Sequence, residues 1–294
     1  VAQDPDHPID ELIPTLAFRH SAGRLSRVDV IDLDVLRRRR MDHSIYSPVR
    51  LNFHLLLFIT HGVGAHEADF ERIELRAGDV LLVRPEQVHA FVPGATHRAL
   101  LLMFTPETLL RAHIPQPVRW REQPVIRPAP EDFRLLVQLL RLQKTLDADA
   151  VDIQAQTVAP YVLGTLLAGL ADVVTARRRP ADVTALRYAA LIENFEDLLD
   201  GNYRAARSPA WYAAELGTTP RTLARACRRV RDGSPKRLID LRVILEAKRQ
   251  LATSADTVES IGYGLGFSEP TNFVKFFKRL TGSTPDAFRQ SPSA

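Results

Sequence analysis

An internal repeat in the last third of the chain restricts the fold more than any other feature of the sequence. One copy runs from Ala213 to Arg229 and the other from Ile261 to Arg279. In both copies a short helical segment ends at a glycine, a polar turn follows, and a second helical segment begins. Placing Leu223 on Phe273 superposes the apolar and basic positions of the second segments. The repeat predicts two helix-turn-helix units in an all-helical domain.

The turn residues supply the chemistry that such units need. A glycine after the first helix can take the left-handed conformation that ends a helix. Thr218 or Thr219 in the first copy, and Ser268 in the second, are predicted to cap the next helix. Pro220 and Pro270 fit the first turn of that helix. The second helices are expected to bury two pairs of residues, Leu223 with Cys227 and Phe273 with Phe277.

The outward side of each second helix carries side chains that can pair with base edges in the major groove. Arg221 and Arg225 lie there in the first copy, and Thr271, Asn272 and Lys275 in the second. Four further basic residues can lie near phosphates: Arg228, Arg229, Lys278 and Arg279. Between the copies, an amphipathic helix at Ile239–Leu251 is predicted to space the two units for successive major-groove segments, about 34 Å apart.

The positive charge of the chain is concentrated in the same region. The whole chain has 39 Lys and Arg against 35 Asp and Glu. Residues 201–294 carry 16 basic and 8 acidic residues, a net charge of +8, whereas residues 1–200 carry 23 and 27, a net charge of −4. Such an asymmetry favours a module that binds a polyanion, here double-stranded DNA, although charge alone also fits a solvated basic surface.

The C-terminal sequence resembles the signature of the AraC/XylS-type transcription regulators. The matching segments are Leu223-Ala224-Arg225, Gly233-Ser234-Pro235, Leu241-Arg242, Ala247–Leu251, Ile261–Phe267, Phe273–Arg279 and Gly282–Arg289. The resemblance implies a DNA-binding domain of seven helices. The DNA-contacting positions that we assign from the repeat and from this resemblance are Arg221, Thr222, Arg225, Arg228, Pro270, Thr271, Asn272, Lys275 and Lys278.

Three positions depart from the family pattern. Ala224 and Pro270 stand where long polar side chains are often found, so base contacts are expected to depend on Arg221, Arg225 and Asn272. Cys227 stands where the family usually has Phe, and a small core residue is a better interpretation of it than a redox sensor.

The N-terminal part is predicted to be a β domain. Short apolar runs separated by Gly and Pro turns lie at Val28–Leu36, Phe53–Thr60, Phe70–Leu75, Val80–Val83 and Arg98–Phe104. The basic run Arg37–Arg40 is expected at a solvated strand edge. Arg76–Phe91 resembles the second motif of cupin barrels, with Gly78 at a turn and Pro85 at a corner. The predicted fold class is α+β multidomain: a cupin-like β-barrel with a helical dimerisation segment, followed by the all-α domain with two helix-turn-helix motifs.

Similarity to the sugar-sensing members of the family places an effector pocket in the barrel. The similarity implies that the pocket is lined by Ser47, His54, Phe91, Ala99 and Leu101. Arg50 or His89 could contact a polar group of the effector. Most of these positions are apolar, which favours a small apolar or aromatic effector over a sugar. A filled barrel without an effector is the alternative.

A cupin enzyme would need a set of His and Glu metal ligands. No His-x-His followed by a Glu at a suitable distance stands near His61 and His66. We therefore predict no bound metal, no cofactor and no catalytic residue.

Helical periodicity predicts two long helices between the two domains. One is Glu131–Leu146 and the other Ile153–Arg177, in which Pro160 starts or kinks a helix. Their apolar faces are wider than one pairing needs, which favours a homodimer seam, whereas packing on the β domain alone is the alternative. The predicted domains are a sensor at residues 1–113, a connector with the helical segment and the Arg177–Asp182 linker at 114–182, and the DNA-binding domain at 183–294.

The sequence as a whole predicts a cytoplasmic transcription regulator, controlled by a small effector and acting as a homodimer on promoter DNA, with RNA polymerase as a candidate further partner. No signal peptide is expected at the polar N-terminus, and no membrane span is expected because no apolar stretch reaches about 18–20 residues. The single cysteine excludes an intrachain disulfide framework. Two rivals stay open: an effector-free regulator controlled by a protein partner or by abundance, and a cupin enzyme fused to a DNA-binding domain.

Overall fold

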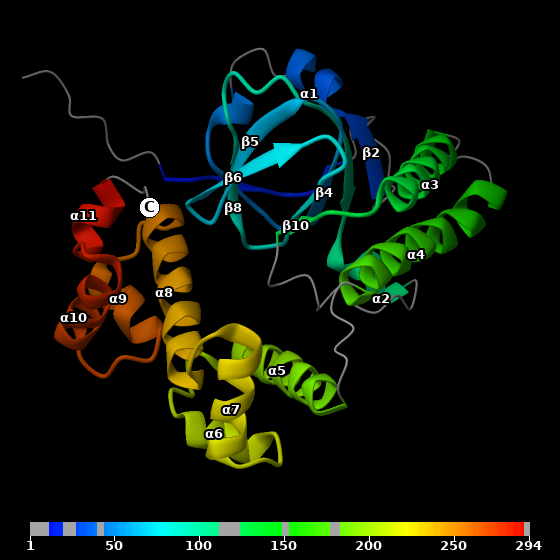
Figure 1. Cartoon of the computed structure of the whole chain (residues 1–294). Helices are drawn as coiled ribbons and strands as arrows, with labels where there is room; N and C mark the ends of the chain where they lie inside the picture. The colour runs from blue at the N-terminus through cyan, green and yellow to red at the C-terminus, as the bar shows by residue number, and fades with distance from the viewer. Residues whose placement is uncertain are drawn as a thin grey trace, which may run out of the picture. The chain divides into compact units, whose positions relative to one another are not determined.

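The computed structural model describes residues 12–19, 28–39, 44–111, 124–148, 153–176 and 183–290. The chain divides into two compact units (Figure 1). One is Thr15–Ala181, and the other is Asp182–Ala294 together with Val1–Pro14. Among the described residues every strand lies in the first unit, so the β structure and the helix-turn-helix repeat are separate bodies.

The β unit contains two five-stranded sheets. Sheet I has the order β1-β3-β8-β5-β6 and sheet II the order β10-β7-β4-β9-β2. The strands of sheet I are β1 (Thr15–Leu16), β3 (Val49–Leu51), β8 (Val88–Phe91), β5 (Val63–Ala68) and β6 (Glu71–Arg76). Those of sheet II are β10 (Val125–Ile126), β7 (Val80–Val83), β4 (His54–His61), β9 (Arg98–Phe104) and β2 (Val28–Asp32).

The predicted N-terminal β domain is confirmed, but its described strands form two sheets that do not join into a closed barrel. Each sheet keeps its own edges among the described strands, and the outer strand of sheet I, β6, alternates charged residues toward solvent. Such an edge does not favour pairing with another strand. The chain instead crosses from sheet II to sheet I in the turn between β7 and β8, where Pro85 stands and Glu86 has a φ of 69°. The Gly78 turn, with a φ of 92°, lies between β6 and β7, so both corners of the cupin-like motif are confirmed.

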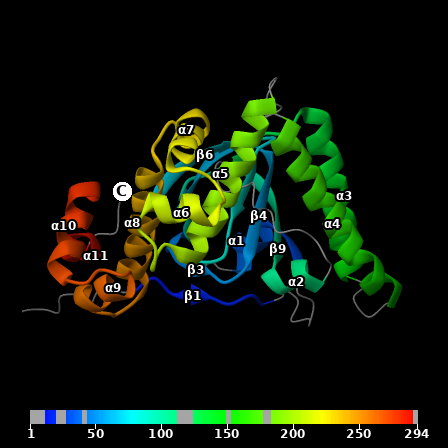
Figure 2. The same ribbon diagram turned by 90° about the horizontal axis from the view of Figure 1, so that it is seen from below.

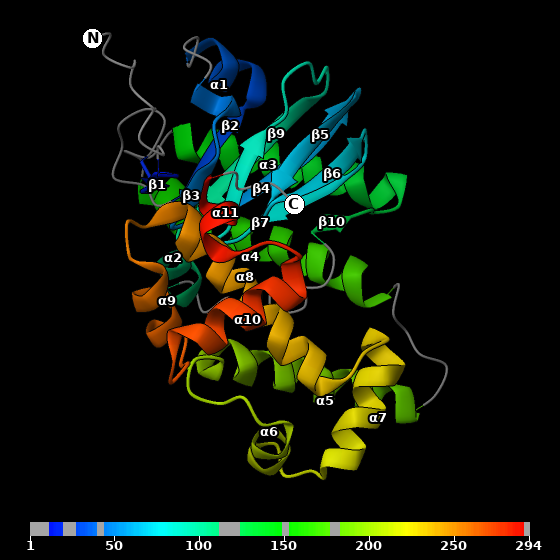
Figure 3. The ribbon, with the colours of Figure 1, turned by 90° about the vertical axis from the view of Figure 1, so that its left-hand side faces the viewer.

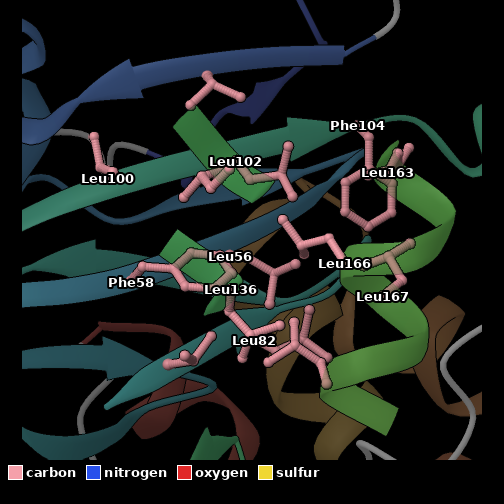
Figure 4. Close-up of a cluster of buried hydrophobic side chains, with 14 of the residues drawn as sticks. Leu56, Phe58, Leu82, Leu100, Leu102, Phe104, Leu136, Leu163, Leu166 and Leu167 are labelled. Atoms are coloured by element: carbon pink, nitrogen blue, oxygen red, sulfur yellow. The ribbon is translucent and has the colours of Figure 1, made fainter. Parts of the chain in front are cut away.

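Sheet II is buried on both faces. Successive side chains of its strands point to opposite sides, and each side packs into its own apolar cluster. Leu55, Leu57 and Leu101 belong to an apolar cluster that includes Val49, Leu51, Phe91 and other residues of sheet I. Leu56 and Leu102 belong to a second cluster, which two long helices complete (Figure 4). The near-continuous hydrophobic sequence of β4, β7 and β9 follows from this double burial.

The two helices are α3 (Pro130–Ala148) and α4 (Ile153–Ala176), and they lie side by side (Figures 1 and 2). Pro160 lies inside α4, not at its start. Leu136, Leu140 and Leu166 pack into the cluster beneath sheet II. The segment predicted to serve dimerisation therefore also shares the core of the β unit.

One stretch of α4, Thr157–Val174, is long and apolar enough to cross a membrane by length and composition alone, with a mean hydropathy of 1.6. The sequence-based expectation that no such stretch exists was therefore wrong. Val162, Leu163, Leu166, Leu167 and Leu170 of this stretch are buried against the β unit.

Some local expectations were wrong. The strand expected at Val28–Leu36 ends at Asp32, and α1 (Leu33–Arg39) follows. In α1, Arg37 is not at a solvated strand edge, because its guanidinium donates hydrogen bonds to the carbonyl oxygens of Ala95 and His97 at 3.1 and 3.0 Å. Strand β5 was not among the predicted apolar runs, and the left-handed Gly62 makes the turn that precedes it. Two short elements, the 3₁₀ helix Ser44–Tyr46 and α2 (Pro106–Arg111), complete the unit.

The second unit contains seven helices within residues 183–290, the number that the family resemblance implies (Figure 3). They are α5 (Val183–Asn202), α6 (Pro209–Glu215), α7 (Pro220–Arg231), α8 (Pro235–Thr253), α9 (Val258–Gly264), α10 (Pro270–Thr281) and α11 (Pro285–Gln290). The predicted linker, Arg177–Asp182, and residues 112–123 of the proline-rich connector lie outside the described residues.

Candidate DNA interface and effector site

The repeat forms two helix-turn-helix motifs, α6 with α7 and α9 with α10. The second helices, α7 and α10, have 12 residues each and begin at Pro220 and Pro270, which are fifty positions apart in the sequence. The first helices end before Gly217 and Gly266, with φ angles of 60° and 85°. Left-handed glycines and first-turn prolines are therefore confirmed in both copies.

The caps of the two second helices differ. The hydroxyl of Thr219 accepts a hydrogen bond from the backbone N–H of Thr222 at 3.1 Å, so Thr219 is the cap of α7. In α10 the N-cap residue is Glu269, with no side-chain capping bond. The expectation that Ser268 caps α10 was wrong, because the turn of the second copy is one residue longer and moves Ser268 out of the capping position.

The inner faces of α7 and α10 form the core of each motif. Leu223 and Cys227 are fully buried in α7, and Phe273 and Phe277 are fully buried in α10, as predicted. Burial raises the pKa of the Cys227 thiol to about 12, and the nearby Glu196 carboxylate acts in the same direction. The thiol is therefore protonated and inert at physiological pH, which supports a packing role for Cys227.

The outer faces present basic and polar residues at equivalent positions. Arg221, Arg225 and Arg228 in α7 correspond in position to Thr271, Lys275 and Lys278 in α10. All six side chains are exposed, and so is that of Asn272. Spacings of four and three residues put each set on one side of its helix.

No hydrogen bond or ion pair within the described residues engages the side chains of Arg225, Lys275 or Lys278. Two other predicted DNA-contacting residues are less free. The hydroxyl of Thr222 is 2.9 Å from that of Thr219, and Pro270 is half-buried in the first turn of α10. Arg279 lies 3.8 Å from Asp240 of α8, although it stays largely exposed.

The helix α8 contacts α5 and α7 on one side of the repeat and α9, α10 and α11 on the other (Figures 1 and 3). It extends beyond the predicted range Ile239–Leu251 at both ends. Because α8 belongs to the core of both motifs, it holds the two exposed basic faces within one body. Two DNA-contacting helices on one rigid support can enter successive segments of the major groove.

The predicted effector residues divide into two groups. Phe91, Ala99 and Leu101 belong to the cluster between the two sheets, and His89 shares their side because it stands two residues before Phe91 in β8. The other three do not join them. Ser47 is exposed, and Arg50 forms an ion pair with Glu86. His54 stacks on Phe104 at 4.9 Å between ring centroids, on the helix-covered side of sheet II.

Sequence reasoning missed a buried pair of histidines beside the apolar cluster between the sheets. His66 Nε2 lies 3.0 Å from His89 Nδ1, and both side chains are buried. Burial lowers the pKa of both imidazoles, that of His89 to about 4. The ring of His66 also meets Phe91 edge-on at 4.9 Å between centroids. Sequence reasoning did not bring His66 and Phe91 together because β5 was not among the predicted strands.

A third histidine lies close to this pair. His97 is fully buried, both of its ring nitrogens lack a hydrogen-bond partner, and its Nδ1 would come within 2.1 Å of a Cβ at Gly64. Within the described part of the chain, no group of three or more His, Cys, Asp or Glu residues is placed to bind a metal ion.

Comparison with known proteins connects both units to one family. The model of the AraC-like ligand binding domain matches residues 30–163, and that of a helix-turn-helix domain matches residues 212–291. The transcriptional activator RhaS of Salmonella arizonae is 24% identical over 271 residues, which cover 87% of this chain and 91% of RhaS. The raffinose operon regulator RafR of Pediococcus pentosaceus is 36% identical over 58 residues, and this match spans about a fifth of each chain.

Among solved structures, fatty-acid-bound ToxT of Vibrio cholerae is 14% identical, with a TM-score of 0.42 and coverage of 91% of this chain and 96% of ToxT. The relatives that match by sequence are transcription regulators. The matched domains stand in the order sensor then double helix-turn-helix, and the structure shows each as a separate unit. The chain belongs to the AraC/XylS-type transcription regulators, which bind DNA and carry an N-terminal ligand-binding domain.

Proposed function

We propose that this regulator reads promoter DNA with the outer faces of α7 and α10. The observation that carries the proposal is the pair of exposed, unpaired basic faces at equivalent positions of two motifs on one supporting helix. Arg221, Arg225 and Asn272 supply the side chains best suited to base edges. Arg228, Lys275 and Lys278 supply positive charge to phosphates, and Thr222, Pro270 and Thr271 border the same surface.

Genome-wide footprinting of bound DNA tests this proposal and supplies the target sites. The recovered sites should contain two short sequence blocks about one helical turn apart, one for each motif. Recovery of DNA without any shared sequence would contradict base reading and leave only charge-driven binding. In vitro transcription with RNA polymerase on a recovered promoter then distinguishes activation from repression.

We infer that the effector is a small apolar or aromatic molecule that binds between the two sheets. The cluster there is apolar, and the buried His66–His89 pair beside it gives a ligand a polar contact. His89, Phe91, Ala99 and Leu101 face this space, and we withdraw Ser47, Arg50 and His54 from the proposed site because they lie elsewhere.

Native mass spectrometry of the purified protein tests the effector proposal. A co-purified small molecule that is lost in a Phe91→Ala variant, and whose removal changes DNA affinity, would support it. Identical DNA binding by the full chain with and without every recovered molecule would favour the effector-free alternative.

We propose no catalytic activity, and we place the protein in the cytoplasm, where chromosomal DNA is accessible.

We further propose that the protein acts as a homodimer through the outer face of α3 and α4. Leu135, Leu142, Val158 and Tyr161 are exposed there, Tyr161 by 74%. Only 28% of the apolar stretch Thr157–Val174 is buried within one chain. A second copy of this face would cover the apolar side chains that water now contacts.

A further inference from the structure

The segment between α5 and α6 brings the first helix-turn-helix motif into contact with the second. Its residues Tyr203–Arg207, which precede the N-cap residue Ser208 of α6, are named here the bridge loop. Its backbone is fixed to the first motif, because the buried Tyr212 hydroxyl of α6 donates a hydrogen bond to the Ala206 carbonyl at 3.1 Å. The N–H groups of Ala205 and Ala206 donate to the Asn202 carbonyl at the end of α5. The loop therefore moves with α5 and α6.

The last residue of the bridge loop reaches the second motif with its side chain. The Arg207 guanidinium lies 4.4 Å from the ring centroid of Phe267 and 5.7 Å from that of Phe276. Its Nη2 donates a hydrogen bond to the carbonyl of Leu265. These residues belong to the end of α9, the turn and α10, so one side chain contacts all three parts of the second motif. Burial lowers the pKa of Arg207, and the Asp240 carboxylate opposes this effect.

The backbone of the bridge loop also meets the turn of the second motif. A Cβ placed on Gly266 would lie 2.0 Å from the carbonyl oxygen of Arg204. Gly266 has a φ of 85°, so glycine is needed both for the turn and for this approach. The two surfaces thus fit through backbone atoms, which cannot move aside as a flexible side chain can.

The start of the bridge loop is fixed to the helix shared by both motifs. The Arg242 guanidinium of α8 lies 4.0 Å from the Tyr203 ring centroid and 2.7 Å from Asp200 of α5. Arg204 lies 3.6 Å from Glu246, which also pairs with Arg242 at 3.2 Å. Burial acts to raise the pKa of Glu246, but the Gln250 amide and the guanidinium groups of Arg242 and Arg249 together lower it, so the carboxylate stays charged.

We propose that the bridge loop fixes the distance and rotation between α7 and α10, with Arg207 and Gly266 as positioning residues for DNA binding at two successive groove segments. Packing against α8 alone would join the two motifs along a single helix, and rotation of one motif relative to the other about that helix would be restrained only by this packing. A second contact between the motifs removes this rotation. One added base pair turns the second groove segment by about 34°, so a fixed rotation makes affinity depend on spacing.

This inference rests on the proposed use of α7 and α10 as the two DNA-contacting helices. The test uses the full chain and a duplex recovered by footprinting, with the natural spacing or with one base pair inserted between the two sequence blocks. Affinities are measured by fluorescence anisotropy for the wild type, Arg207→Ala and Arg207→Lys. Arg187→Ala is the matched control, because it removes the same charge from an exposed position of α5.

For the wild type and for Arg187→Ala, the insertion should weaken binding by at least about fivefold. For Arg207→Ala, the affinities for the two duplexes should differ by no more than about twofold. Relative to the wild type, this variant should lose affinity only for the duplex with the natural spacing. Arg207→Lys keeps the charge but not the planar stacking, and it should lie between the two. An equal loss on both duplexes would overturn the proposal and make Arg207 a general stability or phosphate residue.

A distance measurement without DNA keeps the inference separate from the DNA-binding proposal. Spin labels at Glu215→Cys in α6 and Glu259→Cys in α9 report the separation of the motifs, and both positions are exposed. The native Cys227 is buried and does not compete for the label. Pulsed electron resonance should give a narrow distance distribution for the wild type and a broad one for Arg207→Ala. An unchanged distribution in a folded Arg207→Ala protein would overturn the proposal whatever the DNA result.

Discussion

At the scale of single residues, equivalent positions of the two motifs carry different chemistry. Arg221 of α7 corresponds to Thr271 of α10, and Arg225 corresponds to Lys275. Arginine presents a planar fork that matches guanine, whereas lysine is a point charge that suits phosphate. We therefore expect the first motif to contribute more base specificity and the second more of the salt-dependent affinity.

Replacing Arg225 with Ala should therefore cost about 1–3 kcal/mol of specific binding and relax the preference at one base pair. Lys275→Ala should weaken binding to all sequences more evenly and make it less sensitive to salt. Anisotropy titrations against a set of single-base variants of the recovered site measure both effects, with Arg187→Ala as the control. A uniform loss for Arg225→Ala would identify it as a phosphate contact.

The buried His66–His89 pair makes stability depend on pH. In the unfolded chain each imidazole binds a proton near its ordinary pKa of 6.5, whereas folded His89 stays neutral down to about 4. The unfolded state thus binds more protons, so stability is complete above pH 6.5 and falls as the pH drops toward 4, by about 3 kcal/mol for His89.

Calorimetric unfolding of the full chain at about pH 7.5 and about pH 5 checks this effect on the transition of the β unit. His89→Asn should reduce the difference between the two pH values. His61→Asn is the control, because His61 is exposed at the end of β4, and it should leave the difference unchanged. A wild-type transition that does not move with pH would contradict the buried neutral pair.

At the scale of elements, the helices were predicted more accurately than the strands. The sequence shows the amphipathic periods of α3, α7 and α10 because each of these helices buries one side. Strand β5 and helix α1 were missed for local reasons. β5 contains Gly64 in a space that His97 fills, and α1 follows β2 without a glycine or proline between them. Only tertiary packing makes β5 a strand and not a turn, and makes α1 a helix and not a continuation of β2.

The caps of α7 and α10 give a prediction with a built-in control. Thr219→Ala removes the hydroxyl that accepts the Thr222 N–H, and we expect it to lower the free energy of unfolding of the helical unit by about 1 kcal/mol. Ser268→Ala should have little effect, because Ser268 does not cap α10. Denaturant unfolding followed by circular dichroism compares the two variants. An equal loss of unfolding free energy in the two variants would show that Ser268 caps α10 as Thr219 caps α7, and would contradict the prediction.

At the scale of the whole molecule, the sequence predicted the order and type of the two domains. It did not predict whether the strands of the β unit form a closed barrel. The repeat and the family signature led directly to the double helix-turn-helix unit. The barrel prediction came from one motif, Arg76–Phe91, whose two corners are formed. That motif spans two crossings between the sheets, from β6 to β7 and from β7 to β8, and contains no residue that determines how the outer strands pair. The positions of Arg50 and His54 likewise depended on strand register, which a weak alignment cannot fix.

The exposed face of α3 and α4 gives a prediction about assembly. A charge in the centre of that face, Tyr161→Glu, should shift the protein from dimer to monomer, because an unpaired carboxylate would be buried at the seam. Val63→Glu changes another exposed apolar residue, on β5, and should leave the molar mass of the assembly unchanged. Light scattering during size-exclusion chromatography measures both. A dimer that tolerates Tyr161→Glu would place the interface elsewhere.

The shared helix α8 also determines how the DNA-binding unit folds. Ile239, Val243, Ala247 and Leu251 are fully buried, and α8 contacts helices of both motifs. Neither copy of the repeat therefore has a complete hydrophobic core without it. Although the sequence is duplicated, the two copies cannot melt one after the other as independent modules would. Residues 183–290 are expected to unfold in a single cooperative step, so damage to either copy abolishes both.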